Sequence, residues 1–321
     1  MWWNLLLLIA GFTLLIKGSD VFVDANVGIA RYLRIPPVIV ALTIISIGTG
    51  APEVAITTFA SVGGQNDLAI SNIVGSNMFN LFFIIGLCAL IKPFNINFHI
   101  ISKDFWVSIC VAVLFLFVII ITGEHVPRYV TIGFILIYIG YIAILIRRSL
   151  KNRVGQDVKI EEGDKAPKPM WLNIVLAVIS CGVIVFGASI TVANAEMIAE
   201  HLGMTTHLIG LTVVAAGTSL PELVIALMAC KKGETPMALG TVVGSNIFNI
   251  LMVLGIAGTI SPLEIGTDIR GIVLTDLCVL AFGSLLSLFF VYSGRRLARP
   301  EGAIMVTVYF GYMLFVIISQ I

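Results

Sequence analysis

Two glutamates stand at equivalent places in two similar stretches of the sequence, each within an apolar run. Glu53 lies in IGTGAPEVAIT and Glu222 lies in AGTSLPELVIA. An ionised carboxylate in the middle of a membrane span costs about 2.5 to 3.5 kcal/mol even on a mild insertion scale. No lysine or arginine stands at a matching midspan position to neutralise both. Protonation or a bound cation must therefore compensate them, and carboxylate oxygens suit hard cations such as Ca²⁺.

The residues before each glutamate predict a break in the helix that exposes further oxygen ligands. Pro52 and Pro221 remove a backbone donor, and Gly48 and Gly217 weaken the helix four residues earlier. The end of a half-helix also carries a partial negative charge that attracts cations. The expected ligands are the carbonyls of Ile45 to Gly48 and Val214 to Gly217 and the hydroxyls of Thr49, Thr218 and Ser219.

A second pair of matching blocks, VGSNMFN and VGSNIFN, offers neutral oxygens. Ser76 and Asn80 are four residues apart and share one helix face, as do Ser245 and Asn249. Asn77 and Asn246 turn aside from these faces. Neutral oxygens of this kind suit Na⁺, although small residues such as those in these blocks also allow close helix packing.

The two halves of the chain form an internal sequence repeat. A shift of 169 residues superimposes residues 18–80 on residues 187–249 without a gap. Each half holds an odd number of apolar segments, so the two halves must insert with opposite orientation. Inverted repeats are typical of secondary transporters and place corresponding segments near the bilayer centre.

The composition predicts the elements that carry these motifs. Of 321 residues, 59% are hydrophobic and 12% charged, against about 45–50% and 25% in soluble domains. This excludes a soluble enzyme and predicts an all-α polytopic membrane protein with ten transmembrane helices in two inverted five-helix repeats. The expected spans lie near residues 2–30, 37–62, 67–91, 104–122, 129–147, 171–199, 206–229, 236–260, 271–292 and 301–320.

The net charge and the spacing of the cysteines limit the kinds of ligand and partner that we expect. The net charge of +1 gives no electrostatic support for nucleic-acid binding, and the chain has no Walker or GxGxxG nucleotide signature. The five cysteines show no metal-binding spacing. We therefore expect lipid and transported ions as partners, and no covalent cofactor, nucleic acid, nucleotide or enzymatic activity.

The basic residues predict the orientation. With the first connection inside, nearly all lysines and arginines fall on the cytoplasmic side, and only Arg128 and Arg270 fall outside. Both termini are then extracytoplasmic. The polar stretch at residues 149–170 is a cytoplasmic linker between a first five-helix repeat at 1–148 and a second at 171–321. On the first span, Lys17, Asp20 and Asp24 are spaced to form an ion pair within one helix.

The motifs GTGAPE with GSNMFN, and GTSLPE with GSNIFN, resemble the two signature repeats of the Ca²⁺:cation antiporter superfamily. The branch most similar to this chain is the prokaryotic sodium/calcium exchangers, and the resemblance covers essentially the whole sequence. It implies the sodium/calcium exchanger fold. It also implies that Glu53 and Glu222 are the central Ca²⁺ ligands, with Thr49, Thr218 and nearby carbonyls beside them. The positions that the resemblance assigns to the Na⁺ sites are Ser46, Ala215, Ser76, Ser245, Ser219, Asn80 and Asn249.

Two positions depart from the family pattern. Gly50 stands where the first repeat usually has serine, which removes one hydroxyl from a Na⁺ site. Asn249 stands where K⁺-dependent relatives commonly carry aspartate, which favours a K⁺-independent exchanger.

The resulting hypothesis is a secondary antiporter that exchanges Na⁺ for Ca²⁺ by alternating access at one shared midplane site. The alternatives are an H⁺/Ca²⁺ or K⁺-dependent exchanger, then a Mg²⁺ exporter or a cation channel. Mg²⁺ usually keeps several waters, so a shell of backbone oxygens favours Ca²⁺. The loop-poor chain resembles a multi-pass protein of a prokaryotic plasma (inner) membrane, in which a monomer suffices for transport.

Overall fold

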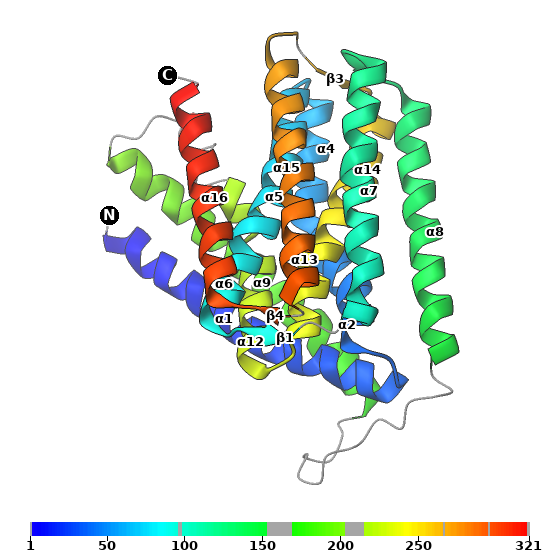
Figure 1. Cartoon of the computed structure of the whole chain (residues 1–321). Helices are drawn as coiled ribbons and strands as arrows, with labels where there is room; N and C mark the ends of the chain where they lie inside the picture. The colour runs from blue at the N-terminus through cyan, green and yellow to red at the C-terminus, as the bar shows by residue number, and fades with distance from the viewer. Residues whose placement is uncertain are drawn as a thin grey trace. The chain divides into compact units, whose positions relative to one another are not determined.

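The computed structural model describes residues 2–95, 98–152, 169–202, 215–265, 267–294 and 296–319, and most of them are helical (Figure 1). Long apolar runs form helices because a bilayer offers no water to backbone polar groups. The described helices, with η for a π-helix, are α1 (Trp2–Leu33), α2 (Pro37–Val40), η1 (Ala41–Ile45), α3 (Ser46–Thr49), α4 (Ala51–Val62), α5 (Asn66–Met78), η2 (Phe79–Ile84), α6 (Ile85–Ile91), α7 (Phe98–Thr122), α8 (Arg128–Asn152), α9 (Met170–His201), α11 (Ala215–Thr218), α12 (Leu220–Lys232), α13 (Thr235–Phe248), η4 (Asn249–Val253), α14 (Leu254–Ile260), α15 (Thr267–Gly294) and α16 (Arg299–Ser319).

The helices agree with the expected spans. Within the described residues, seven helices or continuous helix runs are long and apolar enough to cross a membrane, and residues 37–62 form an eighth span bent by 46°. The tenth expected span coincides with α16. The seventh, at 206–229, lies partly outside the described residues, as does most of the expected linker at 149–170. The chain is a multi-pass helical membrane protein.

The chain divides into two compact units, and each unit draws on both sequence halves. Unit 1 consists of Met1–Thr49 and Tyr141–Thr241, and unit 2 consists of Gly50–Gly140 and Val242–Ile321. The boundaries cut the first repeat within its second and fifth spans, after Thr49 and Gly140, and cut the second repeat once, within its third span, after Thr241. Repeats, which are sequence units, and compact units, which are spatial ones, are different divisions of this chain.

In unit 1, α1 and α9 pack against each other through glycines. A Cβ atom at Gly18 would lie 2.9 Å from Cγ1 of Ile184, and one at Gly187 would lie 3.0 Å from the carbonyl oxygen of Gly11. A side chain at either position would force its neighbours to shift, because the two helices pack closely there. Both helices continue through these glycines without interruption, so Gly18 and Gly187 mark helix contacts.

In unit 2, four two-residue strands pair the connections of one repeat with those of the other. The strand β1 (Phe94–Asn95) pairs antiparallel with β4 (Arg296–Leu297), and β2 (His125–Val126) pairs antiparallel with β3 (Leu263–Glu264). The 169-residue shift carries β1 onto β3. Each strand therefore has its partner in the opposite repeat, as expected when two repeats are related by a two-fold axis.

Helix contacts in unit 2 repeat the same symmetry. The helices α6 and α16 meet at Gly86, where an added Cβ would lie 2.9 Å from the carbonyl oxygen of Gly302. The equivalent residue, Gly255 in α14, faces α8, where an added Cβ would lie 3.2 Å from the carbonyl oxygen of Thr131. Small residues thus allow close packing at corresponding places in both repeats.

The glycine contact between α1 and α9 gives a stability test. We expect Gly187→Ala to lower the thermal unfolding midpoint of the detergent-solubilised protein, with a cost of about 1 to 3 kcal/mol, because the added methyl overpacks the contact. Gly182→Ala is the matched control on the same helix, since nothing lies within 4 Å of its Cβ position. Equal midpoints for the two variants would contradict the close contact.

Candidate ion-binding site

The predicted helix breaks are present, and they fall at equivalent residues. The helix α3 ends at Thr49 and α4 begins at Ala51, with Gly50 at φ −79° and ψ 0° between them. In the second repeat, α11 ends at Thr218 and α12 begins at Leu220, with Ser219 at φ −93° and ψ 8°. The proline in the first turn of each second half-helix needs no backbone donor there, which fixes where that helix restarts.

Glu53 and Glu222 lie in the first turns of the half-helices α4 and α12. Each is buried, with 1% of its surface exposed. The N-terminus of a helix carries a partial positive charge that stabilises a carboxylate by about 0.3 to 1 kcal/mol, and up to about 2 kcal/mol when partly buried. That is less than the cost of burying the charge, so the helix end alone does not compensate it.

The two half-helices also end alike. Gly64 and Gly233 both adopt left-handed backbone conformations, at φ +76° and +83°. The backbone N–H of Gln65 donates to Ala60 and that of Glu234 donates to Ala229, over 2.8 and 2.9 Å. These are glycine-ended helix caps. Each glutamate is therefore carried by a short helix with fixed ends.

The hydroxyl residues that precede or occupy the two breaks belong to unit 1. Ser46 donates to the carbonyl of Ala41 over 2.8 Å, and Thr49 donates to that of Ile45 over 3.1 Å. Ser219 is fully buried, and among the described residues its Oγ has no hydrogen-bond partner. Thr218 is also buried. The side chain of Ala215 and the carbonyl of Val214 lie outside what the structure describes.

The second pair of motifs carries a feature that helical spacing does not reveal. A π-helix begins beside Asn80 in the first repeat, at Phe79, and a second begins at Asn249. Short π-helical turns inside α-helices occur frequently at functional sites. Because they fall at matching places in both repeats, they mark the GSNxFN motif as a special backbone conformation.

Four asparagines of these motifs form a closed hydrogen-bond network in unit 2. Asn77 and Asn246 donate their side-chain Nδ2 groups to each other's backbone carbonyls, both over 3.2 Å. Asn80 donates to Oδ1 of Asn246 over 3.2 Å, and Asn249 donates to Oδ1 of Asn77 over 3.1 Å. Each bond has its counterpart under the 169-residue shift. Helical spacing alone turns Asn77 and Asn246 away from the faces of the other motif residues, but their identical place in both repeats is a sequence signal for a shared role.

The two serines predicted in this pair of motifs are also buried. Ser76 and Ser245 are both fully buried. Among the described residues, Oγ of Ser76 and the Oδ1 atoms of Asn80 and Asn249 have no hydrogen-bond partner. Unit 2 thus holds Glu53 and the four asparagines, and unit 1 holds Ser46, Thr49, Thr218, Ser219 and Glu222.

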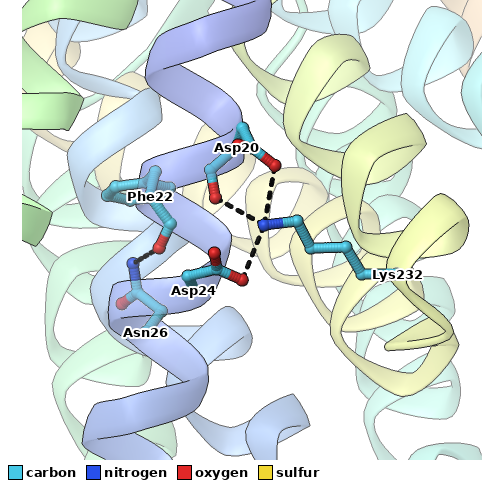
Figure 2. A network of polar contacts seen from close by, with 5 residues as sticks. All are labelled: Asp20, Phe22, Asp24, Asn26 and Lys232. Carbon is cyan, nitrogen blue, oxygen red and sulfur yellow. Dashed lines mark hydrogen bonds and ion pairs between the residues drawn. The ribbon is translucent and has the colours of Figure 1, made fainter. Parts of the chain in front are cut away.

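The prediction of an ion pair within α1 is wrong, because a lysine at the end of α12 forms ion pairs with both aspartates (Figure 2). The Nζ of Lys232 lies 2.8 Å from Oδ1 of Asp20 and 2.6 Å from Oδ1 of Asp24. It also donates to the backbone carbonyl of Asp20 over 2.7 Å. These contacts match the three N–H donors of an ammonium group. Lys17 is exposed and has no ion pair among the described residues.

Two further carboxyl groups that are partly buried have partners close to them. Burial raises the pKa of the Glu234 carboxyl, in the turn after α12, and the positive charge of Arg31 opposes that rise. Asp276 on α15 accepts a hydrogen bond of 2.6 Å from the hydroxyl of Tyr312 on α16. Asp276 therefore links two helices of unit 2 and is not part of the asparagine network.

A helical membrane protein with two inverted repeats, broken helices and a buried carboxylate at each break belongs to the class of secondary transporters. The sequence matches the sodium/calcium exchanger protein family over residues 3–147 and 172–318. The chain therefore belongs to that family.

Individual relatives cover four-fifths or more of the chain. The sodium/calcium exchanger MaX1 of Methanosarcina acetivorans is 30% identical, with 97% of each chain covered. The inner membrane protein YrbG of Escherichia coli is 32% identical over 81% of this chain and 80% of its own. Among solved structures, the sodium-calcium exchanger NCX_Mj superimposes with a TM-score of 0.82 at 26% identity, covering 98% of both chains.

The Lys232 contacts predict a salt-sensitive contribution to stability. We expect Lys232→Met to lower the unfolding midpoint, with a cost of about 1 kcal/mol, because two carboxylates one helical turn apart are left facing each other. Raising the salt concentration should shrink the difference, since Asp20 and Asp24 are half exposed. Lys231→Met is the matched control. A difference between Lys232→Met and wild type that does not change with salt would contradict the electrostatic origin.

Proposed function

We propose that the chain exchanges Na⁺ for Ca²⁺ across the membrane as a secondary antiporter. The observation that carries the proposal is the burial of Glu53 and Glu222 in the first turns after equivalent helix breaks. Two carboxylates neutralise one Ca²⁺, and the hydroxyl, amide and carbonyl oxygens of the two pairs of motifs are of the type that binds both hard cations. Membership of the sodium/calcium exchanger family and the likeness to MaX1 and NCX_Mj support the choice of ions.

The proposed ligands are the residues singled out in the two pairs of motifs. Glu53 and Glu222 serve Ca²⁺ with Thr49 and Thr218, and the neutral side chains serve Na⁺. Because both ions use the same carboxylates, occupancy by one excludes the other, and this competition produces exchange. The neutral Na⁺ ligands in the proposal are Ser46, Ser76, Ser219, Ser245, Asn80 and Asn249, with the backbone at Ala215.

Alternating access completes the proposal. We assign the movement to α1 and α9, which pack tightly on each other through Gly11, Gly18 and Gly187 and can therefore slide as one body. A charge-neutral, ion-loaded site crosses an apolar barrier at lower cost than an empty pair of carboxylates. An empty site then holds the transporter in place, which prevents uncoupled leakage.

The placement in the cell follows from the basic residues. We propose a prokaryotic plasma (inner) membrane with both termini extracytoplasmic, because short loops rich in lysine and arginine stay inside. A single chain holds all of the proposed ligands, so the cycle requires no second copy.

Neutralising either carboxylate should abolish exchange. We expect Glu53→Gln and Glu222→Gln each to weaken Ca²⁺ binding roughly a hundredfold, because one charged ligand and its neutralising role are lost. The measurement is ⁴⁵Ca²⁺ uptake into proteoliposomes preloaded with Na⁺, with K⁺ or with an acid-inside pH gradient. Glu200→Gln, an exposed carboxylate on α9, is the control. Uptake driven by the pH gradient alone would replace Na⁺ coupling by H⁺ coupling.

The Gly50 position predicts a gain of function. Its backbone, at φ −79° and ψ 0°, is close to that of Ser219 at the equivalent position, so a serine can adopt it. We expect Gly50→Ser to lower the half-saturating Na⁺ concentration about three- to tenfold, because the new hydroxyl supplies an oxygen worth about 1 kcal/mol. Ser219→Gly should raise it by a similar factor. The Na⁺ dependence of Ca²⁺ efflux measures both, and two unchanged values would remove these positions from the Na⁺ site.

A further inference from the structure

The asparagine network in unit 2 has only one possible arrangement of its donors and acceptors. A backbone carbonyl accepts hydrogen bonds and never donates them. The groups that Asn77 and Asn246 present to each other's carbonyls, both over 3.2 Å, must therefore be the NH₂ groups of their amides. This fixes the orientation of both amide planes, and leaves their Oδ1 atoms as acceptors.

The orientation of the next two asparagines then follows. Asn249 faces Oδ1 of Asn77, and Asn80 faces Oδ1 of Asn246, so each must present its own NH₂ group. The Oδ1 atoms of Asn80 and Asn249 consequently turn away from the network. Neither accepts a hydrogen bond from any residue that the structure describes. The residues are 1% and 2% exposed.

Two buried acceptors without donors are costly, at about 1 to 3 kcal/mol each. Flipping the amides of Asn80 and Asn249 would not reduce this cost, because each flipped amide would place its oxygen against the Oδ1 atom of Asn246 or Asn77. Those Oδ1 atoms cannot be exchanged for NH₂ groups, because the backbone carbonyls of Asn77 and Asn246 require the NH₂ groups. A bound cation offsets the same cost, because an amide oxygen is a ligand for a hard cation and an amide NH₂ group is not. The arrangement therefore holds two ligand oxygens ready before an ion arrives.

We propose that Asn77 and Asn246 are positioning residues, which lock the amide oxygens of Asn80 and Asn249 toward the transported cation. The network engages both ends of the Asn77 and Asn246 amides, since each Nδ2 donates a hydrogen bond and each Oδ1 accepts one. The inference rests on the proposed function and adds to it the reason for the four-asparagine pattern. It also explains why a neutral amide stands at residue 249, because an ionised carboxylate has no proton to donate to Asn77.

The test is to replace the NH₂ group of Asn77 by an oxygen. Asn77→Asp is nearly isosteric, but when ionised it cannot donate to the carbonyl of Asn246. When protonated, it regains a donor. The Ca²⁺ affinity is measured by titration calorimetry on the purified protein and divided by the wild-type affinity at the same pH. We expect this relative affinity to be at least tenfold lower than that of wild type at pH 8. A large part of that loss should disappear at pH 5.5. Asn246→Asp should behave in the same way.

The matched control is Asn72→Asp. Asn72 is also buried on α5, but its amide donates to the hydroxyl of Thr57 over 3.4 Å. A hydroxyl donates as well as accepts, so an aspartate at this position keeps a hydrogen bond. We expect its relative Ca²⁺ affinity to change less than threefold and to show no recovery in acid.

Asn77→Ala keeps the test decisive if the aspartate variants do not fold. It should lower Ca²⁺ affinity tenfold or more at both pH values, raising the KM of exchange in proteoliposomes while leaving the maximal rate within about twofold. Unchanged affinity in Asn77→Ala, or affinity in Asn77→Asp that rises at pH 8 from the added negative charge, would overturn the positioning role. A wild-type protein that binds neither Ca²⁺ nor Na⁺ would refute the proposed function instead, so the two failures are distinguishable.

Discussion

The cost of burying a carboxylate among apolar helices is the constraint on which the other features of this chain depend. Glu53 and Glu222 are almost fully enclosed, yet each lies in the first turn of a helix that restarts after a break. The positive end of that helix lowers the cost without cancelling it. In the proposed site a bound cation offsets this cost, and a site that is stabilised by its ion is what a coupled transporter requires.

Local sequence was sufficient to predict much of this arrangement. The apolar spans follow from composition, because a bilayer permits only structures that satisfy their own backbone. The breaks at Gly50 and Ser219 follow from glycine and proline at fixed spacing, since both residues destabilise a helix wherever they occur. The glutamates were recognisable because a charge in an apolar run has few structural explanations.

Features that depend on contacts between distant residues were not predictable from the sequence. Lys232 contacts Asp20 across 212 positions of the chain, and only the packing of α12 on α1 places it there. The π-helices that begin at Phe79 and Asn249 were hidden because the expected spacing assumed regular α-helix. The bonds of Asn77 and Asn246 depend on the approach of the two repeats, which spacing within one helix does not describe.

Symmetry separates features that must be shared by the repeats from features that need not be. The asparagine bonds are mutual, so a change in one repeat leaves an unmatched partner in the other, and both repeats keep the same residues. Gly50 and Ser219 occupy equivalent positions without a mutual bond of this kind, and there the two repeats carry different residues. In the proposed cycle, exchanging the conformations of two inverted repeats exchanges the inward and outward states, and symmetric contacts therefore stabilise both states equally. Lys232, whose counterpart is Gly63, lacks that symmetry. An unequal balance between the two states must come from asymmetric contacts of this kind.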